Sequence, residues 1–146
     1  MLKIYSKAAT DGFYYTARTD WKTLNSQLTE NLAIMIPFYD SFLHNNLLKD
    51  GAAIPTFTDK NRPVFCMEDH SLPFDGLIND AVLNYTQNNN YKIQQTHQIY
   101  YYAKDDALAY QTFRCINNRS NLNKPNLEFF SSSKFSFESY LELTKI

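Results

Sequence analysis

The sequence has little glycine, little cysteine and almost no net charge, and each shortage excludes a class of protein. Only 3 of the 146 residues are glycine and 2 are cysteine, so the chain has no glycine-rich phosphate-binding loop and no disulfide framework. Its 14 basic and 15 acidic residues give a net charge of −1. This balance lacks the basic excess of most nucleic-acid-binding proteins and the acidic excess of a nucleic-acid mimic.

Long apolar runs are missing too. No run approaches the roughly 18 apolar residues of a membrane span. The first residues, MLKIYSKAATDGF, lack the apolar core of a signal peptide. We therefore expect a cytoplasmic protein with no membrane partner, in which Cys66 and Cys115 are reduced thiols. Secretion by a route that needs no such signal stays open.

Aromatic residues are abundant by contrast. The chain has 11 tyrosines and 11 phenylalanines, and 44% of its residues are hydrophobic, which argues against intrinsic disorder. A chain of 146 residues has the usual size of one domain and can bury a core without a metal or a disulfide. No repeat or linker divides it, so we predict a single globular α+β domain over residues 1–146.

The first third of the chain predicts two strands and two helices. Alternation favours strands at residues 2–7 and 13–18, with a turn at residues 10–12. Thr19 or Asp20 then caps a helix that Pro37 ends or kinks. The apolar stripe of this helix recurs at spacings of three and four: Trp21, Leu24, Leu28, Leu32 and Met35. The stripe of the second helix, which stops at Gly51, is Tyr39, Phe42, Leu43 and Leu47.

The middle of the chain predicts a strand, a helix and a long hairpin. Residues 63–68 form the strand, and Asp75 caps a helix that runs to about Gln87. Residues 91–116 then predict two long strands that turn at Asp105-Asp106, with His97 opposite Arg114. One face of this hairpin would carry five side chains: Tyr100, Tyr102, Gln111, Phe113 and Cys115.

The end of the chain predicts a last hairpin, from residues 127–131 and 134–137. Residues 137–146 fit a strand or a helix capped by Ser136, and we favour the helix. The fold class is therefore α+β, with an antiparallel sheet of about five or six strands and helices packed mainly on one face.

Cys66 and His70 are the best candidates for catalysis, with an acidic neighbour in Glu68 or Asp69. A thiolate nucleophile needs a base within hydrogen-bond reach and a third group that orients the base. A lone cysteine in an apolar strand more often behaves as a small hydrophobe. We keep a small enzyme as an alternative and assign no catalytic residue.

Other polar groups give weaker signals. A zinc set is present, but it lacks the local spacing of paired ligands, so we predict no metal and no cofactor. A surface pair of His97 and Arg114 could hold an anion, although no glycine-rich loop accompanies it. We expect Asp75 to serve as a helix cap and the other carboxylates to be solvated. The zinc set is Cys66, His70, His97 and Cys115, and the carboxylates are Glu68, Asp69, Asp75 and Asp80.

The run IPFYDSFLHNNLLKDG resembles the Leu-Pro…Tyr…Phe-Leu…Gly helix of the SMI1/KNR4-like immunity proteins. The resemblance covers about a tenth of the chain. The interval from Pro37 to Tyr39 is one residue short, and the segment follows two predicted strands instead of opening the fold. We therefore assign no family.

The aromatic face of the predicted hairpin supports two interpretations. Aromatic strand positions are more often packed in a core, but exposed tyrosines are typical of protein interfaces. Our leading hypothesis is a small protein that binds and inhibits another protein, such as a toxin that an immunity protein neutralises. Its binding residues would be Tyr100, Tyr102, Gln111, Phe113 and Arg114. A single-stranded nucleic-acid-binding module that stacks bases on these tyrosines is a second alternative, and the oligomeric state is open.

Overall fold

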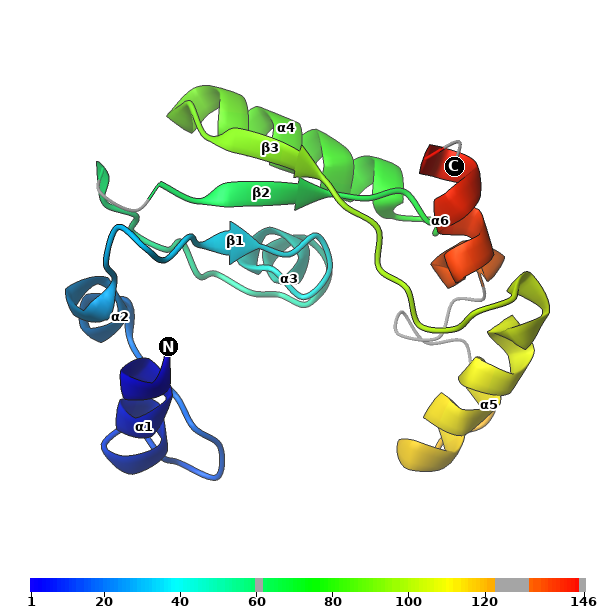
Figure 1. The fold of residues 1–146 in the computed structure, drawn as a ribbon, viewed down its shortest axis with the longest axis horizontal. Coiled ribbons are helices and arrows are strands. Elements are labelled where there is room, and N and C mark those ends of the chain that lie inside the picture. The colour runs from blue at the N-terminus through cyan, green and yellow to red at the C-terminus, as the bar shows by residue number, and fades with distance from the viewer. Residues whose placement is uncertain (60–61, 123–131, 145–146) are drawn as a thin grey trace.

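The computed structural model describes residues 1–59, 62–122 and 132–144, and Figure 1 shows their arrangement. A small three-stranded sheet lies at the centre, in the order β1-β2-β3. Along the chain the elements are α1 (Leu2–Thr10), α2 (Trp21–Gln27), β1 (Met35–Ile36), α3 (Phe42–Leu48), β2 (Val64–Met67), α4 (Asp75–Asn89), β3 (Lys92–Gln95), the 3-10 turn η2 (Lys104–Asp106), α5 (Ala107–Asn117), the 3-10 turn η3 (Ser133–Phe135) and α6 (Phe137–Thr144).

Both strand pairs are parallel, because a helix crosses over between each strand and the next. The chain passes through α3 between β1 and β2, and through α4 between β2 and β3. Ile36 pairs with Phe65 in one register and Phe65 with Ile93 in the other. Parallel neighbours need such crossover connections, whereas a two-residue turn can join only antiparallel strands.

The core gathers around Phe65 on the central strand. Its ring is fully buried and lies within 6.3 Å of four other aromatic ring centroids, those of Phe42, Phe57, Tyr85 and Tyr91. From α4, Ile78 and Val82 complete the cluster. The sequence therefore places its apolar residues around one short strand whose two central residues, Phe65 and Cys66, are buried.

The predicted antiparallel sheet of five or six strands is wrong. Within the described residues the sheet has three strands, all parallel. The predicted strand at residues 93–103 ends at Gln95, and its predicted partner is the helix α5. Asp105 and Asp106 begin this helical segment instead of a hairpin turn, because carboxylates favour a helix N-terminus and the Ala-Leu-Ala run that follows favours helix. The Asp106 carboxylate accepts a hydrogen bond from the Ala103 amide at 3.1 Å.

The predictions for the N-terminal part also fail in places. Residues 2–7 lie in the helix α1, and the second predicted strand is reduced to an isolated bridge between Tyr14 and Thr16. Short apolar runs cannot be assigned to helix or strand by periodicity alone. Asp20 caps α2 as predicted, through a hydrogen bond from the Thr23 amide at 2.6 Å, but the helix ends at Gln27. Of the rest of its predicted stripe, only Met35 lies in a regular element, the strand β1.

Several predicted elements are confirmed. The strand β2, the helices α3 and α4 and the C-terminal helix α6 lie close to their expected positions. Ser136 accepts a hydrogen bond from the Ser139 amide at the start of α6, as a capping serine does. The predicted strand at residues 127–131 lies outside the described residues, and its partner segment is instead η3 and the first turn of α6.

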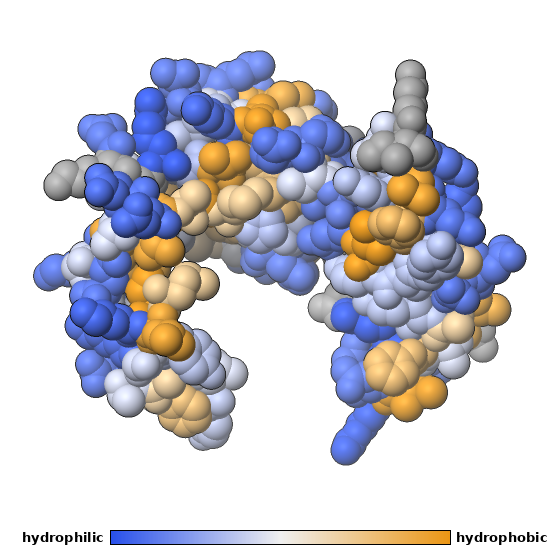
Figure 2. All heavy atoms as spheres, viewed as in Figure 1, coloured by the Kyte–Doolittle hydropathy of each residue, from blue (hydrophilic) through white to orange (hydrophobic). Residues whose placement is uncertain are grey.

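The molecule has two ends that project from the sheet, with α1 and α2 at one and α5 and α6 at the other (Figure 1). Figure 2 shows a hollow between the two ends, with apolar residues on both. The accessible surface is 10338 Å² for a mass of 17.1 kDa. A compact monomer of this mass exposes about 7,800 Å². No helix among the described residues is long and apolar enough to span a bilayer.

Candidate protein-binding surface

The five residues predicted to bind a partner do not share a sheet face, because the hairpin that would carry them is absent. Tyr100 and Tyr102 lie in the segment between β3 and α5, whereas Gln111, Phe113 and Arg114 lie on α5. Tyr102 and Phe113 are 69% and 68% exposed, and Tyr100 is half-exposed. Gln111 and Arg114 are partly buried. The aromatic residues of the set are thus exposed, but they lie on α5 and on the segment before it instead of on a sheet.

The backbone at Tyr100 and Tyr102 is held by the C-terminal segment. The Tyr100 amide donates to the Phe135 carbonyl at 2.9 Å, and the Glu138 amide donates to the Tyr102 carbonyl at 3.2 Å. Between them, Tyr101 and Ser136 form a parallel bridge. The Lys104 ammonium also contacts the Glu142 carboxylate of α6 at 2.6 Å. These contacts fix the direction in which both tyrosines leave the backbone.

Ring stacking holds the two tyrosine side chains to different degrees. The Tyr100 ring stacks on Tyr110 of α5, with 5.1 Å between centroids and an angle of 8° between planes. Burial, with the nearby Tyr110, raises the pKa of Tyr100. The Tyr102 ring stacks on Phe137 at 5.7 Å and is otherwise largely exposed. Tyr100 therefore has a structural role, and Tyr102 is the more accessible of the two.

The helix α5 exposes a wide apolar face that alternation in the sequence concealed. We call Leu108, Ala109, Thr112, Phe113 and Ile116 the α5 stripe. These residues recur at spacings of three and four, so they share one side of the helix. Leu108 and Ile116 are 63% and 72% exposed, and α5 buries Cys115 instead. The spacing was present in the sequence and would have revealed the stripe once a helix was assumed.

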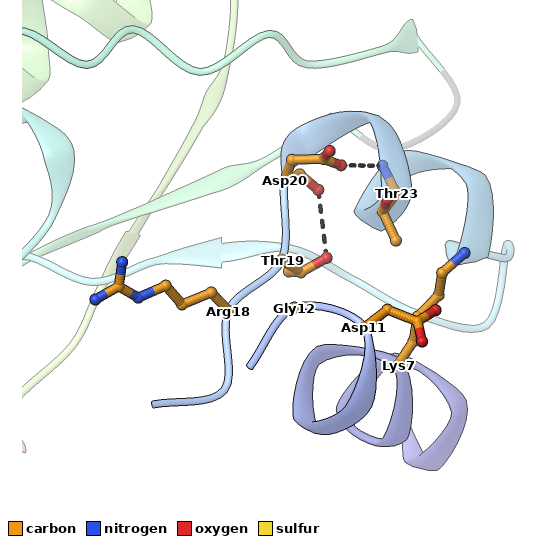
Figure 3. Close-up of a pocket in the computed structure, with 7 residues that line it drawn as sticks. All are labelled: Lys7, Asp11, Gly12, Arg18, Thr19, Asp20 and Thr23. Atoms are coloured by element: carbon orange, nitrogen blue, oxygen red, sulfur yellow. Dashed lines mark hydrogen bonds between the residues drawn. The ribbon is translucent and has the colours of Figure 1, made fainter. Parts of the chain in front are cut away.

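A second exposed apolar group, which the sequence analysis did not single out, lies at the N-terminal end. Tyr5 on α1 and Phe13 to Tyr15 after it are all more than half exposed. Beside them is an open pocket of about 360 Å³ (Figure 3). Its lining mixes both signs of charge: Lys7, Asp11, Gly12, Arg18, Thr19, Asp20 and Thr23. A Cβ on Gly12 would lie 1.9 Å from the Arg18 carbonyl oxygen, so this close approach of two backbone segments requires glycine.

Glu68, which we expected to be solvated, is instead buried and hydrogen-bonded to His70. Glu68 is 3% exposed and His70 is not exposed at all. The His70 Nε2 lies 2.7 Å from one carboxylate oxygen of Glu68, and the backbone amide of Gln98 donates to the same oxygen at 3.0 Å. The Thr96 hydroxyl donates to the other oxygen at 2.9 Å. Our expectation of a solvated Glu68 was therefore wrong.

The other side of His70 contacts the C-terminal segment. Its ring stacks on Phe135, with 3.8 Å between centroids and an angle of 7°. Its Nδ1 lies 3.3 Å from the Lys134 carbonyl oxygen, and the Ser132 hydroxyl donates to the His70 carbonyl. His70 thus connects the end of β2 with the segment that supports Tyr100 and Tyr102.

Asp75 organises the same junction from the start of α4. One of its carboxylate oxygens accepts from the His70 and Leu72 amides at 2.9 and 3.0 Å, and the other accepts from the Tyr39 hydroxyl at 2.8 Å. Burial and the Asp75 carboxylate both raise the pKa of Tyr39. Asp75 is the first residue of α4, and it accepts amides from the preceding loop instead of capping its own helix.

The electrostatics of the cluster favour a charged Glu68 and a neutral His97. Burial raises the pKa of Glu68, but the hydrogen bonds from His70, Thr96 and Gln98 outweigh it and leave that pKa lowered. Burial lowers the pKa of His97, and the nearby His70 adds to this effect. The centroids of the two imidazole rings lie 4.4 Å apart, and the buried Nε2 of His97 has no hydrogen-bond partner among the described residues.

These positions decide how the other predicted sites stand in the structure. His70 has its acidic neighbour, but neither its ring nor Cys66, which is 7% exposed in the core, presents an open surface to a substrate. Among the described residues, no three His, Cys, Asp or Glu side chains converge as a metal site. His97 faces His70 and Tyr140, so its predicted position opposite Arg114 is wrong.

Comparison with known proteins does not add to these observations. Neither a protein-family model nor a curated protein sequence matches this chain. The function therefore has to be argued from the surface itself.

Proposed function

We propose that this chain is a small cytoplasmic protein that binds another protein and inhibits it by occupying its surface, in the manner of an immunity protein that neutralises a toxin. The binding surface lies at the end of the molecule that carries α5 and α6. Its aromatic anchors are Tyr102 and Phe113, and its other members are Tyr100, Gln111 and Arg114. The observation that carries the proposal is the exposure of these two anchors, at 69% and 68%.

The total exposed area supports a protein partner. The 10338 Å² of accessible surface exceeds the area expected for a compact monomer by roughly 2,500 Å². Monomeric soluble proteins rarely expose large contiguous apolar patches, and those that exist commonly mark interaction sites. Tyrosine and arginine are also enriched among the residues that contribute most to binding.

The support of Tyr102 suits a role in recognition. The backbone at Tyr102 is hydrogen-bonded to α6, and its ring stacks on Phe137 at 5.7 Å. A ring that is already held in place loses little conformational entropy when a partner covers it. The largely exposed ring still offers apolar area and a hydroxyl group for a hydrogen bond.

The proposal can be tested by capture of partners from a lysate of the source cells, followed by mass spectrometry. The variant Tyr102→Ala with Phe113→Ala should remain folded, because both side chains are largely exposed, and should lose the captured partner. The matched control is Tyr5→Ala with Phe13→Ala, which removes the same two residue types at 70% and 60% exposure from the opposite end. Equal capture by both double variants would contradict the proposal.

A further inference from the structure

We propose that the α5 stripe is the contact surface of a symmetric dimer, in which the α5 helices of two copies pack antiparallel. The inference rests on the proposed function in one respect, that the α5 end binds protein, and it names the partner there as a second copy of the chain. In the dimer Phe113 faces the second copy, so of the two anchors proposed above only Tyr102, which lies outside the stripe, remains for a different protein.

The stripe has the composition of a helix–helix contact. Leu108, Phe113 and Ile116 are each more than 60% exposed, and no charged residue lies among them. The small residues Ala109 and Thr112 lie near the middle of the stripe, where two helices could approach closely. A fully exposed apolar stripe of this width is expected on a helix that packs against another element.

The order of residues in α5 is complementary to itself when the helix is reversed. In an antiparallel pair related by a two-fold axis, residues equally far from the axis meet each other. If the axis passes between Thr112 and Phe113, these two residues meet across it, and Ala109 meets Ile116 of the second copy. Small and large side chains then alternate across the contact.

Charge selects the antiparallel orientation. Asp105 and Asp106 stand at the start of α5, and Arg119 follows its end, and all three are exposed. Antiparallel packing brings Arg119 of each copy to the acidic end of the other, whereas parallel packing would place like charges together. Within the described residues, neither Asp105 nor Arg119 forms a salt bridge, so both are free to pair between copies.

The exposed area allows the dimer and a further partner together. A standard interface covers roughly 800 Å² of each partner. This is about a third of the roughly 2,500 Å² by which the accessible surface exceeds that of a compact monomer. A dimer through α5 would cover Phe113 and leave Tyr102 exposed for the protein partner proposed above.

The test is sedimentation velocity on the full chain at about 1 to 100 μM, a range suited to a standard-sized interface. We expect the wild-type chain to sediment as a dimer and Ile116→Glu to sediment as a monomer with an unchanged circular dichroism spectrum. Asp105→Arg alone and Arg119→Asp alone should each raise the dissociation constant of the dimer about tenfold. In a two-fold dimer each substitution occurs in both copies, so it replaces two attractive charge pairs with two repulsive ones. Position 119 has a positive φ of 51°, which aspartate tolerates.

Mixing the two charge variants provides the decisive measurement. The Asp105→Arg copy carries arginine at positions 105 and 119, and the Arg119→Asp copy carries aspartate at both. Each end of the mixed pair then joins an arginine to an aspartate, so the mixture should form heterodimers with the affinity of the wild type. A monomeric wild-type chain throughout this range, or a mixture no tighter than its components, would overturn the inference. Such a failure is distinct from that of the proposed function, because Tyr102→Ala alone leaves the α5 stripe unchanged and tests only the capture of a different protein.

Discussion

Removal of the Glu68 carboxylate is the most direct test of the buried polar cluster. In Glu68→Ala three donors lose their acceptor: the His70 ring, the Thr96 hydroxyl and the Gln98 amide. An unpaired buried donor costs about 1–3 kcal/mol. The donors on Thr96 and Gln98 are partly buried and can recruit water, so each contributes about 1 kcal/mol, whereas the fully buried His70 contributes about 2 kcal/mol.

The expected loss of unfolding free energy is therefore about 4 kcal/mol, a large part of the 5–15 kcal/mol that typically stabilises a domain. Urea unfolding at pH 7, followed by far-ultraviolet circular dichroism, measures it directly. Glu68→Gln keeps one acceptor oxygen and should lose less than Glu68→Ala.

Asp69→Ala is the matched control, because Asp69 is the adjacent carboxylate and is exposed. It accepts a hydrogen bond from the Ser71 amide at 2.8 Å in an exposed turn, so its removal should cost about 0.5 kcal/mol. If Glu68→Ala and Asp69→Ala unfolded at the same urea concentration, the buried hydrogen bonds described for Glu68 would not exist in solution.

Two further predictions concern acid and the core. Stability should fall on acidification in two stages. The first begins near pH 6.5, because burial lowers the folded-state pKa of His97 from that value. The second lies below pH 4.5, because the hydrogen bonds to Glu68 outweigh its burial and lower its folded-state pKa. In both cases the unfolded chain binds more protons, so urea midpoints that stayed constant or rose between pH 7 and 4 would refute the assignment. Phe65→Ala should cost about 3–5 kcal/mol, because it empties the centre of the aromatic core, whereas Phe113→Ala should cost about 0.5 kcal/mol in the monomer, because its ring is exposed; denaturation of both variants at low protein concentration compares them.

The elements that the sequence predicted correctly are those whose signal is local. The strand β2 is a continuous apolar run that follows a proline, and α4 combines a polar start with an apolar stripe over fifteen residues. In both cases the residues that define the element also form its buried side, which includes Phe65 on β2 and Ile78 on α4.

The stretch from residue 91 to residue 116 could not be predicted in this way, because the length of a strand depends on its neighbour. The strand β3 pairs with β2, which ends at Met67, and beyond it the Gln98 backbone amide donates to the Glu68 side chain instead of to a strand carbonyl. Among the described residues β3 has no strand partner beyond Gln95, and the alternating residues that follow lie in the segment before α5 and in α5 itself. Alternation alone cannot report the length of a strand elsewhere in the fold.

The buried polar cluster was even less predictable. Its members come from four separate parts of the chain, around Tyr39, residues 68–75, residues 96–98 and residues 132–135. Glu68, His70 and Asp75 lie close together in the sequence, but a short polar run of this kind is normally solvated. The exposed aromatic residues Tyr102 and Phe113 could be selected from residue type alone. The helix α5 and the segment before it, which carry them, were predicted instead as a hairpin.

The core of the sheet half and the junction that joins it to the C-terminal half depend on different interactions. The junction is where the buried cluster meets the proposed surface. The sheet half has an apolar core around Phe65, whereas the segment that presents Tyr102 joins it through the stack of Phe135 on His70 and the hydrogen bonds beside that stack. Apolar contacts tolerate small shifts, but hydrogen bonds of a buried pair have a narrow range of geometry. The buried pair of Glu68 and His70 therefore fixes the position of the proposed binding surface relative to the sheet, which gives a reason for burying polar groups there.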